Sequence, residues 1–167
     1  MRKLWIGWLV VVLLITGCGY RFSGGGTLPR DVKHVFVAML ENRSQETGIE
    51  SILSNDLIYE FSRSGTLAKG KHHADAQLTG VIDVVTKGTI SRISINTSLE
   101  RRVSLIISFR LTGKDGEVLW SARRMSENEV YLVEKDKETT EHNRRLAIQR
   151  LSKRLAEKVY QRLTDNF

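Results

Sequence analysis

Apolar residues recur every three or four positions in two stretches of the chain, which is the pattern of an amphipathic helix. The first stretch runs from Ile49 to Phe61 and precedes Gly65, a residue type that commonly ends helices. Thr47, with Glu50 three positions later, predicts a capping box at its start. The second stretch begins near Thr140. The two apolar stripes consist of Ile49, Ile52, Leu53, Leu57 and Phe61, and of Ala147, Ile148, Leu151, Leu155, Val159 and Leu163.

Four other stretches have the pattern of strands. Residues 35–40 are apolar almost throughout, and residues 76–85 and 101–111 alternate. Lys114-Asp115-Gly116 is a hairpin turn that leads into a return strand over residues 117–125. One face of each alternating strand is expected to carry Leu78, Gly80, Ile82 and Val84, then Val103, Leu105, Ile107, Phe109 and Leu111, then Val118, Trp120 and Ala122.

Two polar segments complete the domain. Residues 87–100 are expected to extend the flanking strands around a turn near Asn96, and residues 126–140 to form a charged connection. The order is therefore strand, helix, strand, strand, strand, helix. This order predicts an α+β fold, a two-layer sandwich with two helices packed on one face of a roughly four-stranded, mostly antiparallel sheet.

The first seventeen residues have the pattern of a secretory signal peptide: Arg2 and Lys3, an apolar run over residues 4–15, then small residues. The run is shorter than the ~20 residues that a membrane-spanning helix needs. Ile15-Thr16-Gly17-Cys18 resembles a bacterial lipobox, which implies that residues 1–17 are removed and that Cys18 becomes the lipidated N-terminus. The alternatives are a buried thiol or half of a disulfide, but the chain has one cysteine and no internal partner for it.

The residues after Cys18 indicate the location and the domain boundary. Gly19 follows the cysteine where an aspartate would indicate inner-membrane retention, so the analogy with enteric lipoproteins favours the outer membrane. Residues 18–31 are interpreted as the lipidated N-terminus and a glycine-rich linker, and residues 32–167 as a single α+β domain. Gly24-Gly25-Gly26 could suggest a phosphate loop, but no Gly-Lys-Ser/Thr follows.

The charge balance suits an acidic partner. Without Arg2 and Lys3, 24 basic residues remain against 19 acidic ones, a balance of +5. Anionic lipid, nucleic acid and an acidic protein surface all fit this charge, and export argues against nucleic acid. The second helix carries a basic face, read either as a site for anionic lipid or as a solvated surface whose long side chains cover the core edges. That face comprises Arg144, Arg145, Arg150, Lys153, Arg154, Lys158 and Arg162.

The chain lacks the motifs of common catalytic sites. It contains no Gly-x-Ser-x-Gly, His-Glu-x-x-His or Cys-x-x-Cys motif. The adjacent His72 and His73 are expected to be exposed loop residues and not metal ligands. Asp115 and Glu117 belong to a hairpin turn. We therefore expect no enzyme activity, no cofactor and no metal, but a tethered binding or scaffold module.

One family has this combination of features. Cys18-Gly19-Tyr20-Arg21-Phe22 is similar to the mature start of the lipopolysaccharide-assembly lipoproteins (LptE-like), and the order of elements is similar over essentially the whole chain. The resemblance implies an α/β sandwich inside the lumen of the outer-membrane lipopolysaccharide translocon barrel (LptD-like). There the protein would plug the barrel, aid its assembly and contact lipopolysaccharide from a lipid anchor on the periplasmic side.

The resemblance also implies which basic residues contact lipopolysaccharide. Arg92 matches a basic position before the family's third strand, and Lys135 or Lys137 matches one ahead of its last helix. Arg101 and Arg102 enter a strand side by side, so they point to opposite faces and only one can join such a patch. Ordinary solvated surface is the alternative for all five. The alternative functions are another periplasm-facing lipoprotein with a basic lipid- or cell-wall-binding surface, and a lipoprotein hydrolase, for which the sequence offers no nucleophile.

Overall fold

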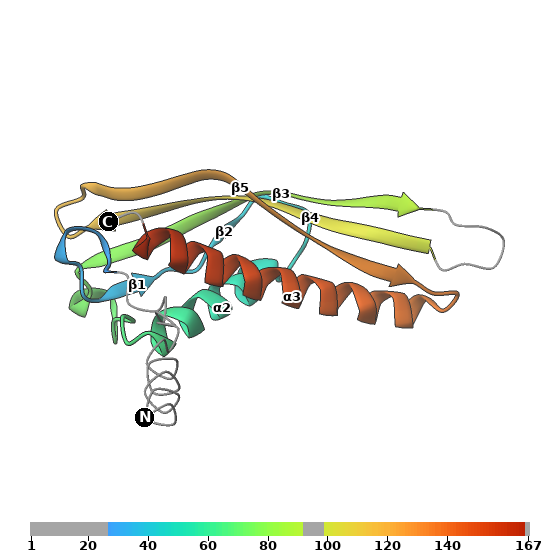
Figure 1. Ribbon diagram of the computed structural model, residues 1–167, viewed down its shortest axis with the longest axis horizontal. Helices are drawn as coiled ribbons and strands as arrows, with labels where there is room; N and C mark the ends of the chain where they lie inside the picture. The colour runs from blue at the N-terminus through green and yellow to red at the C-terminus, as the bar shows by residue number, and fades with distance from the viewer. Residues whose placement is uncertain (1–26, 92–98, 166–167) are drawn as a thin grey trace, which may run out of the picture.

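The computed structural model describes residues 27–91 and 99–165. Figure 1 labels the larger elements of this part of the chain. In chain order they are the 3-10 turn η1 (Pro29–Asp31), β1 (Val35–Val37), β2 (Glu41–Asn42), α2 (Ile49–Arg63), the 3-10 turn η2 (Lys71–His73), β3 (Ala76–Ser91), β4 (Leu99–Gly113), β5 (Val118–Val133) and α3 (Lys137–Thr164).

The strands form one mixed sheet in the order β1-β3-β4-β5, and β2 pairs with β3 on the same side as β1. β1 and β2 run parallel to β3, whereas the three long strands are antiparallel. α2 therefore belongs to a crossover between parallel strands. The α+β prediction is confirmed, with five strands in place of about four because Glu41 and Asn42 form an additional short strand that pairs with β3.

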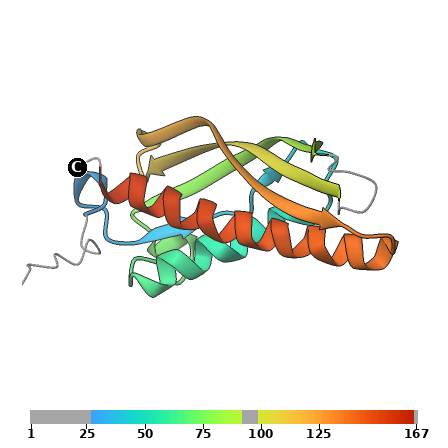
Figure 2. The same cartoon turned by 45° about the vertical axis from the view of Figure 1, so that its right-hand side comes forward.

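Both helices cover the same face of the sheet, and the opposite face is left open (Figures 1 and 2). α2 packs on α3, which lies along β5. The predicted apolar stripes of both helices are buried, apart from Ile52, which is partly buried against the core. From the sheet they meet Leu78, Ile82, Val103, Leu105, Ile107, Phe109 and Leu111, all of which are buried.

Two β-bulges turn apolar residues away from the face that the alternation predicted. A register shift between Ile82 and Val84 leaves Val84 40% exposed, while Val85 packs against the core. A second shift, at the start of β5, leaves Val118 48% exposed. An extra residue in one strand reverses the facing of every residue beyond it, so the predicted placements of Val84 and Val118 were wrong.

β5 is longer than predicted because it continues through residues 126–133, which were expected to form a connection. Its second half carries charged residues on the helix-covered face, and these hide the apolar alternation. α3 begins at Lys137, three residues before the expected start. The extensions of β3 to Ser91 and of β4 from Leu99 are confirmed; the turn expected near Asn96 lies outside the described residues.

β5 is the outer strand of the sheet, and α3 covers part of its free edge. Asn143 Nδ2 donates to the carbonyl of Leu132 at 3.2 Å, and Arg154 Nη2 donates to the carbonyl of Asn128 at 2.8 Å. Unpaired carbonyls on an edge strand attract further strands, so these two bonds reduce the exposed pairing capacity of the edge.

The start of α2 differs from the prediction. Gly48 is the N-cap residue, with a φ of 87°, and no side chain caps the helix. The Glu50 carboxylate instead accepts a hydrogen bond of 2.7 Å from Asn42 Nδ2. The predicted capping box was therefore wrong, because a residue of the preceding strand binds the glutamate.

No helix in the described ranges combines the length and apolar character needed to cross a membrane. Cys18 and the expected signal peptide and linker lie outside the described residues, so the boundaries at residues 17 and 31 stay predictions.

Candidate functional site

The end of the sheet where β4 begins and β5 ends brings together four of the predicted lipopolysaccharide-contacting residues. Leu99 of β4 pairs with Val133 of β5, and Arg101 and Arg102 follow along β4. Lys135 lies in the turn from β5 into α3, and Lys137 is the first residue of α3. We call this region, residues 99–102 and 130–137, the distal end; it lies at the right of Figures 1 and 2. Arg92, like Cys18, lies outside the described residues.

Arg101 and Arg102 point to opposite faces of the sheet. Arg101 pairs with Tyr131, which is buried, and Arg102 pairs with Val130, which is 36% exposed. Val103 is buried under the helices, and successive side chains of a strand point to opposite faces of the sheet. Arg101 therefore lies on the helix-covered face and Arg102 on the open face. Both arginines are exposed, and neither side chain has a hydrogen bond or ion pair with another described residue.

Lys135 and Lys137 are presented on a turn that hydrogen bonds hold in place. Asp136 caps α3, since its carboxylate accepts from the Thr139 amide at 2.7 Å. The Thr139 hydroxyl and this amide hold the pKa of Asp136 below its usual range. The Thr140 hydroxyl accepts from the Glu134 amide at 2.9 Å. Both lysines are exposed, but residues 134–138 contain three acids and two lysines, so the turn as a whole is not positive.

Most basic residues on the sheet-facing side of α3 are paired with acidic residues of β5. Lys158 lies 3.1 Å from Glu127, Arg150 lies 2.9 Å from Glu129, and Arg154 lies 2.8 Å from Glu129. Although partial burial raises the pKa of Glu129, hydrogen bonds from Arg150 and Arg154 outweigh it, and the net pKa is lowered. These three cations hold α3 to the sheet, which neither interpretation of the basic helix face anticipated.

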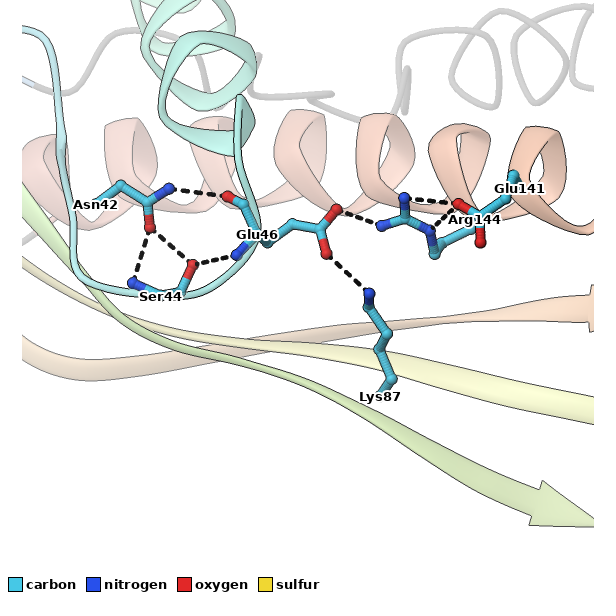
Figure 3. A network of polar contacts seen from close by, with 6 residues as sticks. All are labelled: Asn42, Ser44, Glu46, Lys87, Glu141 and Arg144. Carbon is cyan, nitrogen blue, oxygen red and sulfur yellow. Dashed lines mark hydrogen bonds and ion pairs between the residues drawn. The ribbon is translucent and has the colours of Figure 1, made fainter.

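A second polar network fixes the first half of α3 (Figure 3). The Glu46 carboxylate, in the loop before α2, contacts Arg144 of α3 and lies 3.1 Å from Lys87 of β3. Arg144 also lies 2.7 Å from Glu141. Partial burial raises the pKa of Glu46, but hydrogen bonds from Arg144 and Lys87 prevail and lower it.

The Glu46 loop is itself held by hydrogen bonds. Asn42 Nδ2 donates to the Glu46 carbonyl at 2.8 Å, and Ser44 Oγ donates to Asn42 Oδ1 at 2.7 Å. The network thus joins three elements that are far apart in sequence, and it places α3 relative to the distal end.

A groove on the open face of the sheet contains two arginines to which the sequence assigned no function. Arg110 and Arg123 line it and have no ion pair with other described residues. Arg43, also in the groove, is paired with Glu41 at 2.7 Å. Arg110 and Arg123 are distant in sequence, and the pairing of β4 with β5 brings them into one groove.

The described residues contain no cluster suited to metal binding. Within the described ranges, no group of three His, Cys, Asp or Glu side chains could hold a metal ion. His72 and His73 are exposed in η2, as expected. Asp115 accepts a hydrogen bond from the Glu117 amide at 3.0 Å, which is a turn contact.

Comparisons with known proteins agree with this architecture. The family model described as lipopolysaccharide-assembly (LptE) matches residues 32–163. No curated protein sequence matches the chain significantly.

Several solved lipoprotein structures share the fold. A minor lipoprotein of Acinetobacter baumannii has a TM-score of 0.55 at 13% identity, over 81% of this chain and 93% of that one. Lipoprotein B of Nitrosomonas europaea has a TM-score of 0.55 at 13% identity, over 80% and 83%. The rare lipoprotein B of Shewanella oneidensis has a TM-score of 0.52 at 10% identity, over 78% and 94%. At these identities the likeness shows the fold alone.

Proposed function

The chain belongs to the lipopolysaccharide-assembly (LptE) family, and from this premise we propose that it plugs and helps assemble the lipopolysaccharide translocon barrel of the outer membrane. In this role it contacts lipopolysaccharide during insertion into the outer leaflet and has no enzymatic activity. Cys18 carries the lipid anchor and holds the protein on the periplasmic side. The family match over residues 32–163 is the observation that carries the proposal.

The surface of the domain is compatible with lipopolysaccharide contact. Arg101, Arg102, Lys135 and Lys137 are exposed at the distal end, and none has an ion pair with another described residue. Free guanidinium and ammonium groups can form charge-assisted hydrogen bonds with phosphate. Arg101 and Arg102 are better placed than Lys135 and Lys137, because both lysines are flanked by acids.

Co-purification tests the barrel partner. Full-length protein with a C-terminal tag, extracted from outer membranes in a gentle detergent, is expected to bring down one large β-barrel protein in near-equal amount, identified by mass spectrometry. Recovery of the lipoprotein alone would refute the plug and favour a tethered, basic lipid- or cell-wall-binding module.

The lipid anchor is tested at Cys18. Cys18→Ser is expected to block processing and lipidation, because serine lacks the thiol to which the lipid would be attached. Intact mass spectrometry of the membrane fraction then shows the unprocessed chain without acyl groups. Acylated, processed protein in this variant would contradict the assignment of Cys18.

Charge reversal tests the lipopolysaccharide contacts. Arg92→Glu, Arg102→Glu and Lys135→Glu are each expected to reduce co-purified lipopolysaccharide by about tenfold, since one hydrogen bond to a charged group is worth ~1.5–3 kcal/mol. Lys69→Glu is the matched control, because Lys69 is exposed, has no ion pair with another described residue and precedes the opposite end of β3. An equal loss in the control would indicate an effect of net charge alone.

A further inference from the structure

The second half of β3 has an open edge, at the right of Figure 1. β2 pairs with the first half, and just after it the Arg43 amide donates to the carbonyl of Ile82 at 3.0 Å. From Val84 to Ser91, β3 pairs with β4 alone among the described residues. No described side chain hydrogen-bonds to the backbone of this stretch. It therefore lacks the cover that α3 gives to the edge of β5.

The pairing with β4 shows which backbone groups of this stretch point outward. The carbonyl of Leu78 points away from β4, since it accepts from the Ala38 amide at 3.0 Å, and Leu78 pairs with Leu111. Every second residue of β4 counted from Leu111 therefore has a partner whose amide and carbonyl point outward. Over the open stretch these partners are Val85, Lys87 and Thr89.

A groove on the open face of the sheet follows the same edge. It has a volume of about 440 Å³ and includes Gly88, where an added Cβ atom would have no neighbour within 4 Å. Gly88 pairs with Arg102, which also lines the groove. Neighbouring strands lie ~4.8 Å apart, so a side chain of an added strand can reach Arg102 across the bare backbone of Gly88. The other lining residues are Thr86, Lys87, Thr89, Ile90 and Ser104.

The charges of this groove favour an acidic side chain. Its lining contains two cations and no acid. The Lys87 ammonium lies 3.1 Å from Glu46, whereas Arg102 has no ion pair with another described residue. A lysine on an edge strand usually hinders the addition of a further strand, and its engagement with Glu46 reduces this effect.

A second copy of the chain is poorly suited to this edge. Residues 84–91 contain no acid, so pairing of two such edges would bring only cations together. The residues outside the described ranges contain no acid either. The complementary carboxylate is therefore expected from another protein.

We propose that the open stretch of β3 binds an extended acidic segment of a partner protein, which adds to the sheet as a strand and places a carboxylate at Arg102. Backbone hydrogen bonds to Val85, Lys87 and Thr89 supply affinity, and the carboxylate supplies specificity. This inference goes beyond the proposed function, because it concerns strand addition by a protein and not contact with lipid.

The test uses two synthetic peptides. One is an acetylated eight-residue peptide of alternating threonine and valine with one central glutamate, and the other has glutamine in its place. Full-length protein in a neutral detergent is titrated with each peptide and followed by nuclear magnetic resonance. The glutamate peptide is expected to bind about three- to fivefold more tightly, as for a favourable exposed ion pair.

Amide hydrogen exchange in the complex reports on strand addition. The amides of Val85, Lys87 and Thr89 should exchange more slowly when the glutamate peptide is bound. Those of Thr86 and Gly88 should not change, because they already face β4. Binding that leaves the outward amides unprotected would overturn strand addition.

Variants assign the two parts of the interaction. Thr89→Pro removes an outward amide and is expected to weaken both peptides at least about tenfold, although an edge strand tolerates proline. Arg102→Glu is expected to reverse the preference between the peptides. Arg110→Glu is the matched control, because Arg110 is exposed on the same strand and lines a different groove; it should leave the preference unchanged. Circular dichroism confirms that each variant is folded.

The remaining outcomes are separate from those of the proposed function. Equal binding of both peptides would overturn the acidic occupant, and no binding of either peptide would overturn the proposal as a whole. The peptide titrations contain neither barrel nor lipopolysaccharide. Failure here would therefore leave the co-purification tests of the plug and of lipopolysaccharide contact unaffected.

Discussion

Gly80 allows two apolar side chains to meet over the middle of β3. A Cβ atom at this position would lie 2.7 Å from Cδ2 of Leu40 and 2.8 Å from Cδ1 of Phe109, closer than side-chain carbons approach each other. Leu40 and Phe109 are both buried, so neither can move aside into solvent. The absence of a side chain is therefore what lets the segment after β1 pack against β4.

Gly80→Ala is expected to lower the free energy of unfolding by about 1–3 kcal/mol, the usual cost of overpacking a core. Urea unfolding of the purified protein measures this change. Gly88→Ala, on the same strand, is the matched control because a Cβ there would have no neighbour within 4 Å. If both variants unfolded at the same urea concentration, the close approach at Gly80 would carry no cost.

Glu46 is a residue whose ionisation stabilises the fold. Its side chain is 14% exposed and the Arg144 side chain 16%, so their ion pair is shielded from water. The pKa of Glu46 is lowered in the folded protein. The ionised Glu46 side chain therefore stabilises the fold fully above the unfolded pKa of ~4.3, and this stabilisation is lost as the pH falls through the lower folded pKa.

Glu46→Gln is expected to lower the free energy of unfolding at pH 7 by about 1–3 kcal/mol, since it removes hydrogen bonds between charged groups. It should also make the loss of stability below pH ~4.3 shallower than in the wild type. Chemical denaturation between pH 7 and pH 3 measures both effects. Glu41→Gln is the control: its ion pair with Arg43 has side chains 56% and 61% exposed, and exposed pairs are worth only ~0–1 kcal/mol. Parallel pH curves for the wild type and Glu46→Gln would contradict the assignment.

At the scale of elements, the attachment of α3 to β5 depends on charge as well as on apolar packing. Glu127 and Glu129 are 18% and 20% exposed, and they face Arg150, Arg154 and Lys158 across the two elements. The aliphatic stripe of α3 is fully buried beside them. Apolar contacts alone select the position of the helix along the strand less strictly than ion pairs do. The ion pairs therefore determine this position.

Glu127→Gln combined with Glu129→Gln is expected to lower the free energy of unfolding by about 1–3 kcal/mol, because half-buried cations lose their charged partners. Amide hydrogen exchange should increase in α3 more than in α2. Glu117→Gln serves as the control, since its pair with Arg30 is largely exposed. An unchanged exchange rate in α3 would mean that the apolar stripe suffices.

The same elements show what the sequence could and could not predict. The four-residue spacing from Ile49 to Phe61 identified the buried face of α2, because helix periodicity is a local property. The facing of Val84 and Val118 could not be predicted, because a bulge is defined by the partner strand. The second half of β5 was missed because Glu127 and Glu129 occupy inward positions that are usually apolar.

The candidate site, like the fold, could be predicted from the sequence only in part. The exposure of Arg101, Arg102, Lys135 and Lys137 could be inferred from charge alone, and the structure adds that they share the distal end. The structure also shows that three other arginines, unlike these four residues, are paired with acidic residues: Arg144, Arg150 and Arg154. This pairing depends on contacts between residues distant in sequence. No local pattern reports such contacts.

At the scale of the whole molecule, one core joins both helices to four of the strands. The buried apolar residues form a single cluster that includes both helices and strands β1, β3, β4 and β5. Such a domain is expected to unfold in one cooperative transition. Trp120, on β5 near the end of the domain opposite the distal end, is the one tryptophan among residues 18–167.

Thermal unfolding followed by Trp120 fluorescence and by far-ultraviolet circular dichroism should therefore give the same midpoint. The fluorescence reports on one end of β5, and the dichroism is dominated by α2 and α3. A lower midpoint by dichroism would mean that a helix leaves the sheet first and would contradict a single cooperative unit.

The hydrogen bonds from Asn143 and Arg154 to the edge of β5 have a consequence for how the protein reaches its folded state. α3 follows every strand in the chain, so β5 can pair with β4 before the helix that covers its edge has docked. In that interval the outer strand shows unpaired carbonyls, through which strands of separate molecules can associate. Docking of α3 thus protects the edge of β5 against aggregation, and the rate of docking limits how long a newly made molecule can associate with its neighbours through this edge.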